Sequence, residues 1–464
     1  MKRLLCHLPI ACLLTLWING DWGHTILGQE PRNPTKYLEA ALKVENWLAA
    51  VQRVDKDGRV FWPTCPDESQ DFTFDWYHGN TGVVDFYLDL HDATHEEKYL
   101  QRAIEGADHL QHKIDSLNSN EPPGLFTGVA GYGQTMIHVW KKTKQEKHKR
   151  AALRCIEFLE SQAKSKESYV GNACHFNGVT DVISGSAGIT GFLLYAHESL
   201  DSQASLELAI RCGDGLLADG IKTNSVDGKT EMLHWRMSDS LERDYPNMSH
   251  GTAGVCGALL KLDEALNVNR ANRSYDQRFL DAAIKGGEYL KSIAARNEGQ
   301  CLVFHHSPGG EDLFYLGWCH GPPGTSAVLL ALGEIANRDD FTKMGRMGAT
   351  TILKNGLFKN RTPGFWNNVG QCCGTAGVAV FLATMFYETN EKVYLAECRR
   401  LTEDLLNRAT IVELPDGKVG LNWLQAEHRT RPDGLKAQTG FMQGAAGIGQ
   451  WLLDMHDLES GAAR

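Results

Sequence analysis

The stretch Gln371-Cys372-Cys373-Gly374-Thr375-Ala376-Gly377 joins two features on which the prediction of the fold depends. Two adjacent thiols precede a Gly-x-x-Gly unit, and an apolar run follows that unit. The same unit recurs in register through the chain, at Gly79–Gly82, Gly128–Gly131, Gly185–Gly188, Gly251–Gly254, Gly321–Gly324 and Gly444–Gly447. Successive units lie about 50 to 70 residues apart, which is room for one helix, a loop and a second helix.

Two kinds of helix alternate along the repeats. Runs that follow a glycine unit, such as Val255–Leu262 and Val378–Met385, are apolar on most faces, whereas Ala151–Ala163 and Asp281–Ala295 carry one charged face. A helix that is apolar all round must be enclosed, and an amphipathic helix can cover it. The sequence therefore predicts an all-α fold, an α/α toroid of seven inner helices ringed by seven outer helices. Short extended pieces are expected in three loops, at Ser168–Cys174, Gln300–Phe304 and Lys418–Trp423.

Composition and charge limit the possible partners. The chain has 464 residues and a formal net charge of -10, which argues against nucleic acid as a partner. A cationic start, Met1-Lys2-Arg3, precedes the apolar run Leu4–Ile18, which is typical of a signal peptide and too short to span a membrane. We therefore expect a signal peptide over residues 1–22, a linker over 23–33 and the toroid over 34–464.

Localisation depends on that leader. A functional signal peptide implies export to the periplasm or secretion, and a disordered extension or a wrongly assigned start would leave the protein in the cytoplasm. We expect no stable membrane insertion. Because a closed toroid completes its own core, we expect a monomer.

Residues just before the glycine units should gather at one mouth of the toroid. His78, His250, His320 and Cys373 directly precede a first glycine, and Cys319 and Cys372 lie one position earlier. Thiolates are natural Zn²⁺ ligands, and three protein ligands with one open position are typical of a catalytic zinc site.

The sequence alone leaves other interpretations of these residues open. Cys372 and Cys373 could instead form a vicinal disulfide, or be unrelated buried thiols. His250 is a candidate proton donor, Asp181 a candidate base or partner of a histidine, and His320 a neighbour of the metal ligand Cys319. A helix cap is the plainer role for Asp181.

The seven repeats, with Gly317-Trp318-Cys319-His320-Gly321 and Cys372-Cys373-Gly374, resemble the lanthionine synthetase C-like family of lanthipeptide cyclases, over about Tyr37 to Met455. The resemblance implies a zinc enzyme that adds the thiolate of a peptide cysteine to dehydroalanine or dehydrobutyrine, after which a protonated side chain protonates the enolate. It implies a dehydrated peptide, or a small thiol, as substrate. The implied zinc ligands are Cys319, Cys372 and Cys373. The implied acid/base residues are Asp181 and His250, and His320 matches a position that is often Tyr or His.

The chain departs from the family pattern at two positions. Cys373 stands where the common pattern has His, and a third thiolate should make a bound thiolate more nucleophilic. An arginine that often precedes the Trp-Cys motif is missing from Asp312–Gly317, which leaves the stabilisation of the enolate unassigned.

Two other functions fit parts of the sequence. A carbohydrate-active toroid enzyme would need two carboxylates, for which Asp181 and Asp75 are candidates, and aromatic residues such as Trp76 and Trp318 could stack on sugars. A zinc-bearing binding protein without turnover would account for the missing arginine.

Overall fold

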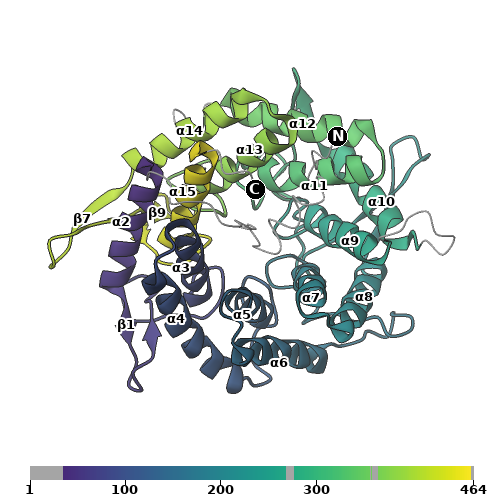
Figure 1. Cartoon of the computed structure of the whole chain (residues 1–464). Helices are drawn as coiled ribbons and strands as arrows, with labels where there is room; N and C mark the ends of the chain where they lie inside the picture. The colour runs from purple at the N-terminus through teal and green to yellow at the C-terminus, as the bar shows by residue number, and fades with distance from the viewer. Residues whose placement is uncertain (1–34, 268–275, 356, 358–363, 461–464) are drawn as a thin grey trace, which may run out of the picture.

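The computed structural model describes residues 35–267, 276–355, 357 and 364–460, so the expected leader and linker lie outside the described residues. Fourteen helices in these ranges form two concentric layers (Figure 1). The inner helices are α3 (Asn80–Thr94), α5 (Val129–Thr143), α7 (Ser186–Leu200), α9 (Thr252–Leu266), α11 (Pro322–Ile335), α13 (Thr375–Thr389) and α15 (Ala445–Ser460). The outer helices are α2 (Lys36–Val51), α4 (Glu97–Asp115), α6 (Glu146–Gln162), α8 (Gln203–Ala218), α10 (Arg278–Ile293), α12 (Asp339–Asn355) and α14 (Lys392–Asn407).

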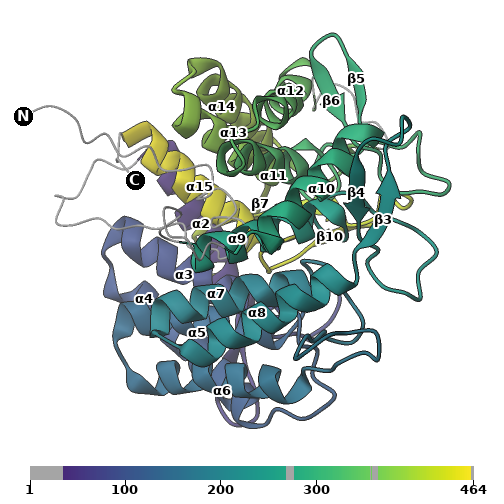
Figure 2. The ribbon, with the colours of Figure 1, turned by 90° about the vertical axis from the view of Figure 1, so that its right-hand side faces the viewer.

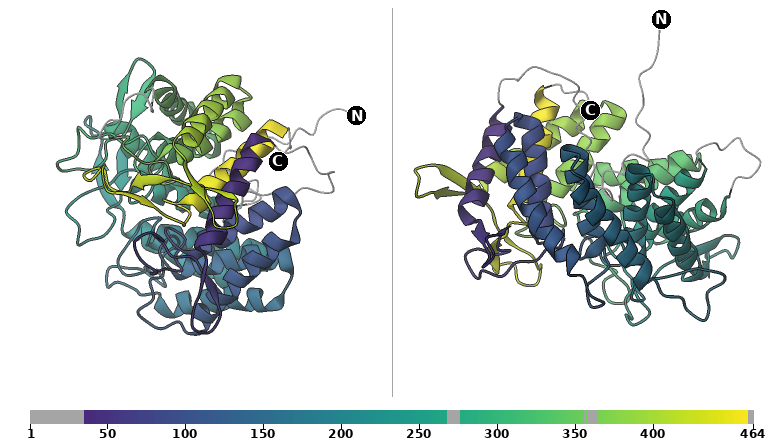
Figure 3. Two further views of the ribbon diagram at one scale, coloured as in Figure 1. Left: turned by 90° about the vertical axis from the view of Figure 1, so that its left-hand side faces the viewer. Right: turned by 60° about the horizontal axis from the view of Figure 1, so that its bottom comes forward.

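The inner layer closes on itself. Each inner helix contacts the next, and α15 contacts α3, which completes the ring. Each inner helix also packs against the outer helix that follows it in sequence, except that α15 takes α2, from the opposite end of the described chain, as its outer partner (Figure 3). This arrangement confirms the predicted α/α toroid.

The two layers differ in burial as the apolar patterns predict. Val378, Ala379 and Val380 are successive residues of α13 and so point about 100° apart around the helix, and all three are fully buried. In contrast, α4 buries Ala103 and Ala107 but exposes Asp108. The enclosed inner helices therefore form the core, which the outer helices separate from solvent (Figure 2).

The glycine units fit a tight turn at the start of each inner helix. The first glycine is the N-cap residue of α3, α5, α7, α9, α11 and α13. A Cβ at the second glycine would clash with the preceding segment: at Gly377 it would lie 1.9 Å from the carbonyl oxygen of Gln371. The same turn supplies acceptors for the first N–H groups of the helix, as where the Ala376 N–H donates to Val369 at 3.1 Å. These N–H groups are therefore satisfied within the chain rather than free to bind an anion.

A closed circle of backbone hydrogen bonds links all seven units. Its members lie two or three residues before each first glycine, and each N–H donates to a carbonyl of the next unit at 2.9–3.2 Å. The donor-to-acceptor pairs are Tyr77 to Phe126, Phe126 to Ile183, Val182 to Ser249, Ser249 to Cys319, Cys319 to Cys372, Cys372 to Met442 and Met442 to Tyr77. The circle holds the starts of the inner helices in one plane at one end of the toroid.

The strands are short antiparallel pairs in the loops. They are β1 (Arg53–Val54) with β2 (Val60–Phe61), β3 (Ile221–Asn224) with β4 (Glu231–His234), β5 (Ala295–Asn297) with β6 (Gln300–Leu302), β7 (Thr410–Glu413) with β8 (Val419–Asn422), and β9 (Leu424–Ala426) with β10 (Leu435–Ala437). Two expected extended pieces contain β6 and β8, but 168–174 forms no strand. None of the described helices has the length and apolar character needed to cross a bilayer.

The pKa of Glu388, near the end of α13, can be used to test how the inner helices pack. Burial, and then the charge of Glu334 at the end of α11, raise the pKa of Glu388 to about 7. Because the folded-state pKa lies above the ordinary value of 4.5, ionisation is disfavoured in the fold, and stability falls as the pH rises between these values. Glu388→Gln should therefore raise Tm by roughly 1–2 °C at pH 8 and leave it unchanged near pH 4. The exposed Glu413→Gln serves as control, and an equal shift at both pH values would contradict the assignment.

Candidate metal centre

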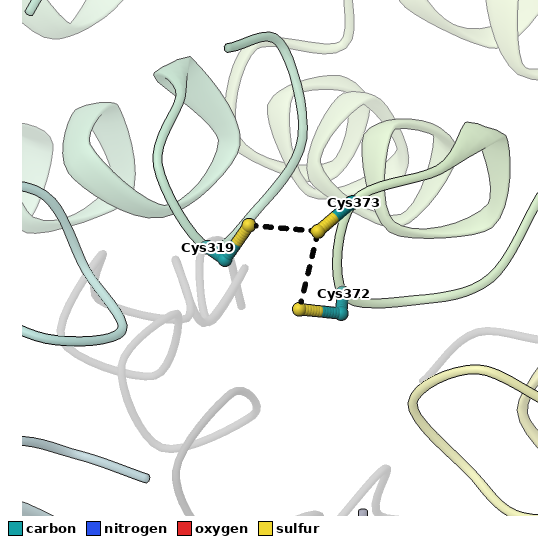
Figure 4. Close-up of side chains that lie close together, drawn as sticks. All are labelled: Cys319, Cys372 and Cys373. Carbon is teal, nitrogen blue, oxygen red and sulfur yellow. Dashed lines mark hydrogen bonds between the residues drawn. The ribbon is translucent and has the colours of Figure 1, made fainter. Parts of the chain in front are cut away.

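Three cysteine thiols converge where two neighbouring units of the backbone circle meet (Figure 4). The Cys319 N–H donates to the Cys372 carbonyl at 3.0 Å, which brings the two chain segments together. The Cys373 sulfur lies 3.0 Å from the Cys319 sulfur and 3.5 Å from the Cys372 sulfur. All three sulfurs lie within 4.8 Å of one another and are buried.

This donor set fits a zinc ion. A tetrahedral zinc with Zn–S bonds of about 2.3 Å separates its sulfur ligands by roughly 3.8 Å, which is within the span of the observed separations. Hydrogen bonds from Cys319 and Cys373 lower the pKa of the Cys372 thiol, whereas burial raises the pKa of Cys319. One thiolate is thus favoured, and three buried thiolates need a cation. Within the described ranges these cysteines are the one group with ligand atoms close enough to hold a metal, which leaves the fourth position to another ligand.

Asp181 and His250 form a hydrogen-bonded pair beside the thiols. The His250 Nδ1 lies 2.6 Å from Asp181 Oδ2, and the other carboxylate oxygen accepts from the Ser184 N–H at 2.8 Å. Asp181 is fully buried, while the His250 side chain is 27% exposed. With Nδ1 engaged, Nε2 is the ring nitrogen of His250 left to exchange a proton. Asp181 is therefore the partner of a histidine and also stabilises the turn before α7; it does not cap that helix, whose N-cap residue is Gly185 with no side-chain cap hydrogen bond.

His320 belongs to a cluster of rings on the same side as His250. Its Nε2 lies 3.4 Å from the Ser249 hydroxyl, and its buried Nδ1 has no hydrogen-bond partner. Its ring centroid lies 4.2 Å from that of His305 and 5.5 Å from that of His250. Burial, followed by the neighbouring His306, lowers the pKa of His305 to about 3, and burial also lowers the pKa of His320. Both rings are therefore neutral at physiological pH.

Several groups around this site carry no signal in the sequence that connects them with it. Tyr315 packs its ring on His305 at 4.2 Å between centroids, and Tyr77 receives a hydrogen bond on its hydroxyl from Gln443 Nε2 at 2.9 Å. The half-buried Arg429, in the turn between β9 and β10, approaches the same region. Its guanidinium opposes the rise that burial causes in the pKa of Tyr315. Loop residues carry no repeat register, so no sequence signal connected Arg429 with the metal centre.

A pocket of about 470 Å³ lies on the side of His78. The segment 64–73, His78 and the β9–β10 hairpin line it. His78 Nε2 lies 3.2 Å from Glu427 Oε1. Burial acts to lower the pKa of His78, but the contact with Glu427 raises it overall. The same contact lowers the pKa of Glu427. The Gln438 amide nitrogen donates to Glu427 at 3.4 Å, which leaves the buried Gln438 Oε1 without a partner. The pocket therefore presents an ion pair beside the Gln438 amide, whose oxygen is shielded from solvent.

The chain is similar to known proteins in both sequence and structure. The family model described as lanthionine synthetase C-like protein matches residues 70–461. Nisin cyclase is similar in structure, with a TM-score of 0.55 and 16% identity over 84% of this chain and 90% of that chain. The Lin0763 protein from Listeria innocua has a TM-score of 0.49 and 13% identity over 93% of this chain and 99% of that chain. A GH76 α-mannanase from Bacteroides thetaiotaomicron has a TM-score of 0.48 and 9% identity, over 92% and 97%.

The structural likeness to nisin cyclase agrees with the toroid and bears on the fold alone. The match to the family model is stronger evidence of relationship, because it spans well over half of the sequence and includes all three clustered cysteines. This protein therefore belongs to the lanthionine synthetase C-like family.

Proposed function

We propose that this protein is a zinc-dependent enzyme that adds the thiol of a peptide cysteine, or of a small thiol, to a dehydroalanine or dehydrobutyrine residue. The addition breaks the S–H bond, joins sulfur to the β-carbon and places a proton on the α-carbon, so the product is a thioether. The observation that carries the proposal is the group of three buried thiols beside the Asp181–His250 pair, in a member of this family.

Zinc held by Cys319, Cys372 and Cys373 would lower the pKa of a substrate thiol and so favour its nucleophilic form. Side chains of the protein itself bind and transfer the proton. The buried Asp181 carboxylate fixes the His250 tautomer and stabilises a positive charge on that ring. His250 Nε2 then delivers the proton to the α-carbon of the adduct. His320 and His305 are neutral and line the same space without adding positive charge.

Arg429 is our candidate for stabilising the enolate. Addition of a thiolate to a dehydroamino acid places negative charge on the neighbouring carbonyl oxygen, and a fixed cation lowers the barrier for such a step. Asp312–Gly317 contains no arginine, and the Arg429 guanidinium reaches Tyr315 from the β9–β10 turn instead. A positive group can thus serve the site from a distant part of the sequence.

We assign the pocket beside His78 to the peptide flanking the reacting residues. Its lining includes the Glu427 carboxylate and the His78 ring, polar groups that can hydrogen-bond the main chain of an extended peptide. The paired charges of His78 and Glu427 leave the pocket without a strong field of either sign.

The carbohydrate-active alternative receives less support. Both Asp181 oxygens accept hydrogen bonds, and Asp75 Oδ1 accepts from the His78 N–H at 2.7 Å, so neither carboxylate is poised as a free acid or nucleophile. The aromatic residues offered for sugar stacking, Trp76 and Trp318, are buried in the core. Binding without turnover predicts that the wild type binds a dehydrated peptide and forms no thioether.

Metal content tests the zinc site. The purified, reduced protein should contain about one zinc per chain, and Cys373→Ala should lose most of it because two thiolates bind far less tightly than three. Cys398→Ala, which removes a buried thiol from outer helix α14, should keep its zinc. A wild-type protein without zinc, with Cys372 and Cys373 joined as a disulfide, would refute the site.

Substitution of the acid/base pair tests catalysis. With a peptide that carries one dehydroalanine and one cysteine, His250→Asn and Asp181→Asn should each slow cyclisation about 100-fold while retaining zinc. Cyclisation conserves mass, so the product is counted by mass spectrometry as peptide that can no longer be alkylated on sulfur. The exposed His112→Asn is the control. Binding of the peptide with no cyclisation by the wild type would favour the non-catalytic alternative.

Arg429 can be tested in the same assay. Arg429→Ala should reduce kcat about 100-fold and Arg429→Lys by less, because the charge rather than the shape stabilises the enolate. Arg150→Ala, on the exposed face of α6, should behave as wild type. Wild-type kcat in Arg429→Ala would mean that another group stabilises the enolate.

A further inference from the structure

Cys174 and Cys212 form a second pair of neighbouring thiols, away from the metal centre. Cys174 lies in the segment between α6 and α7, and Cys212 lies in the middle of α8 (Figure 2). Their sulfur atoms are 3.7 Å apart, and both residues are buried. The structure has no disulfide bond among the ten cysteines of the described chain. Other buried thiols donate to carbonyls instead, such as Cys256 to Ala283 and Cys398 to Ala379.

The backbone, and not only the two side chains, holds this pair together. The Cys174 N–H donates to the Arg211 carbonyl at 3.0 Å, directly beside Cys212. One turn further along α8, a Cβ at Gly215 would lie 2.1 Å from the Cys174 carbonyl oxygen. The segment therefore rests on the helix backbone at a site where only glycine fits. Closing the remaining gap to a disulfide bond of about 2.05 Å requires side-chain rotation rather than movement of α8.

The surroundings favour reaction at Cys174. A pocket of about 680 Å³ between α6 and α8 is lined by Asn172, Arg211 and Glu160, which are sequence or spatial neighbours of the two thiols. Arg211 Nε donates to the Asn172 carbonyl at 3.0 Å, which joins the segment before Cys174 to the helix residue before Cys212 at the pocket. The hydrogen bond from Cys212 lowers the pKa of Cys174, whereas burial raises it. The charge of Arg211 also lowers this pKa. A lower thiol pKa increases the thiolate fraction, which is the reactive form.

We propose that Cys174 and Cys212 are a redox-active dithiol that a low-molecular-weight disulfide converts to a disulfide bond. The Cys174 thiolate attacks one sulfur of the small disulfide and displaces one small thiolate, giving a mixed disulfide on Cys174. The Cys212 thiolate then attacks the Cys174 sulfur and displaces the second small thiolate. Two cysteine thiols are oxidised, the small disulfide is reduced to two small thiols, and the two protons pass to the released thiolates.

The disulfide bond would link the segment that carries Asp181 covalently to the outer helix α8. Six residues lie between Cys174 and Asp181, and Thr180 and Val182 donate backbone hydrogen bonds to the neighbouring segments. A cross-link over a sequence separation of 38 residues restricts the unfolded chain and so stabilises the fold. This inference is independent of the proposed thioether chemistry, because neither thiol belongs to the metal centre.

The test uses the full chain, loaded with one equivalent of zinc to protect the cluster thiols, and 2-hydroxyethyl disulfide as the oxidant. After alkylation of free thiols in denaturant, peptide mapping should identify one cross-linked peptide that joins Cys174 to Cys212. The oxidised protein should melt about 5 °C higher than the reduced protein, and dithiothreitol should reverse the change. The zinc content should be the same in both states.

Three variants separate the pair from other thiols. Cys174→Ala and Cys212→Ala should each abolish the cross-link and the rise in Tm on oxidation, whereas Cys155→Ala, a buried thiol of α6, should retain both. Because a core substitution can itself lower stability, the mapping of the wild type decides the question. Full alkylation of Cys174 and Cys212 after oxidation, or a mixed disulfide that persists on Cys174, would overturn the proposal.

Discussion

The closed circle of backbone hydrogen bonds that joins the seven glycine units is the constraint on which the rest of the molecule depends. Each link pairs the residues just before one inner helix with those before the next, at 2.9–3.2 Å. Because the circle closes from Met442 to Tyr77, no unit can shift without breaking two links. The tight turns explain the second glycine of the units: in six of the seven a Cβ there would meet a carbonyl oxygen of the same turn, and at Gly82 it would meet Phe441 of the neighbouring unit.

The candidate metal centre is a direct consequence of this circle. Cys319 and Cys372 are consecutive members of it, so their positions are set by main-chain hydrogen bonds rather than by flexible side chains. Cys373 follows by one residue and completes a group of three sulfurs. A site held by the backbone is preorganised, and a preorganised set of thiolates need not reorganise to receive a metal. The same rigidity fixes Asp181, because the next residue, Val182, is a member of the circle and donates to the Ser249 carbonyl.

The two sides of the thiol cluster differ in chemistry. On one side lie His250, His305 and His320, with the His320 ring tilted against the other two; burial keeps His305 and His320 neutral by lowering their pKa values. On the other side, His78 and Glu427 form an ion pair at the edge of a polar pocket. An asymmetric cavity of this kind can orient a substrate, because proton transfer and binding of the flanking chain are assigned to opposite sides. Arg429 adds a cation to the first side from a hairpin far along the sequence.

The sequence by itself determined the toroid, the alternation of inner and outer helices and the three thiols at one mouth. These features depend on hydrophobic periodicity and on glycine at fixed positions, which are local properties of each repeat. Position within the repeat also predicted that Asp181 and His250 come near the cysteines, and it left Asp181 as a base, the partner of a histidine or a helix cap; the structure shows the hydrogen-bonded pair with His250. Only the tertiary structure decided which loop residues surround the site and which buried thiols meet. Arg429, Glu427 and His305 lie in long loops without a repeat register, and Cys174 approaches Cys212 because the chain between α6 and α7 folds back onto Gly215. Such contacts depend on the path of each loop across the closed ring, which no periodic pattern encodes.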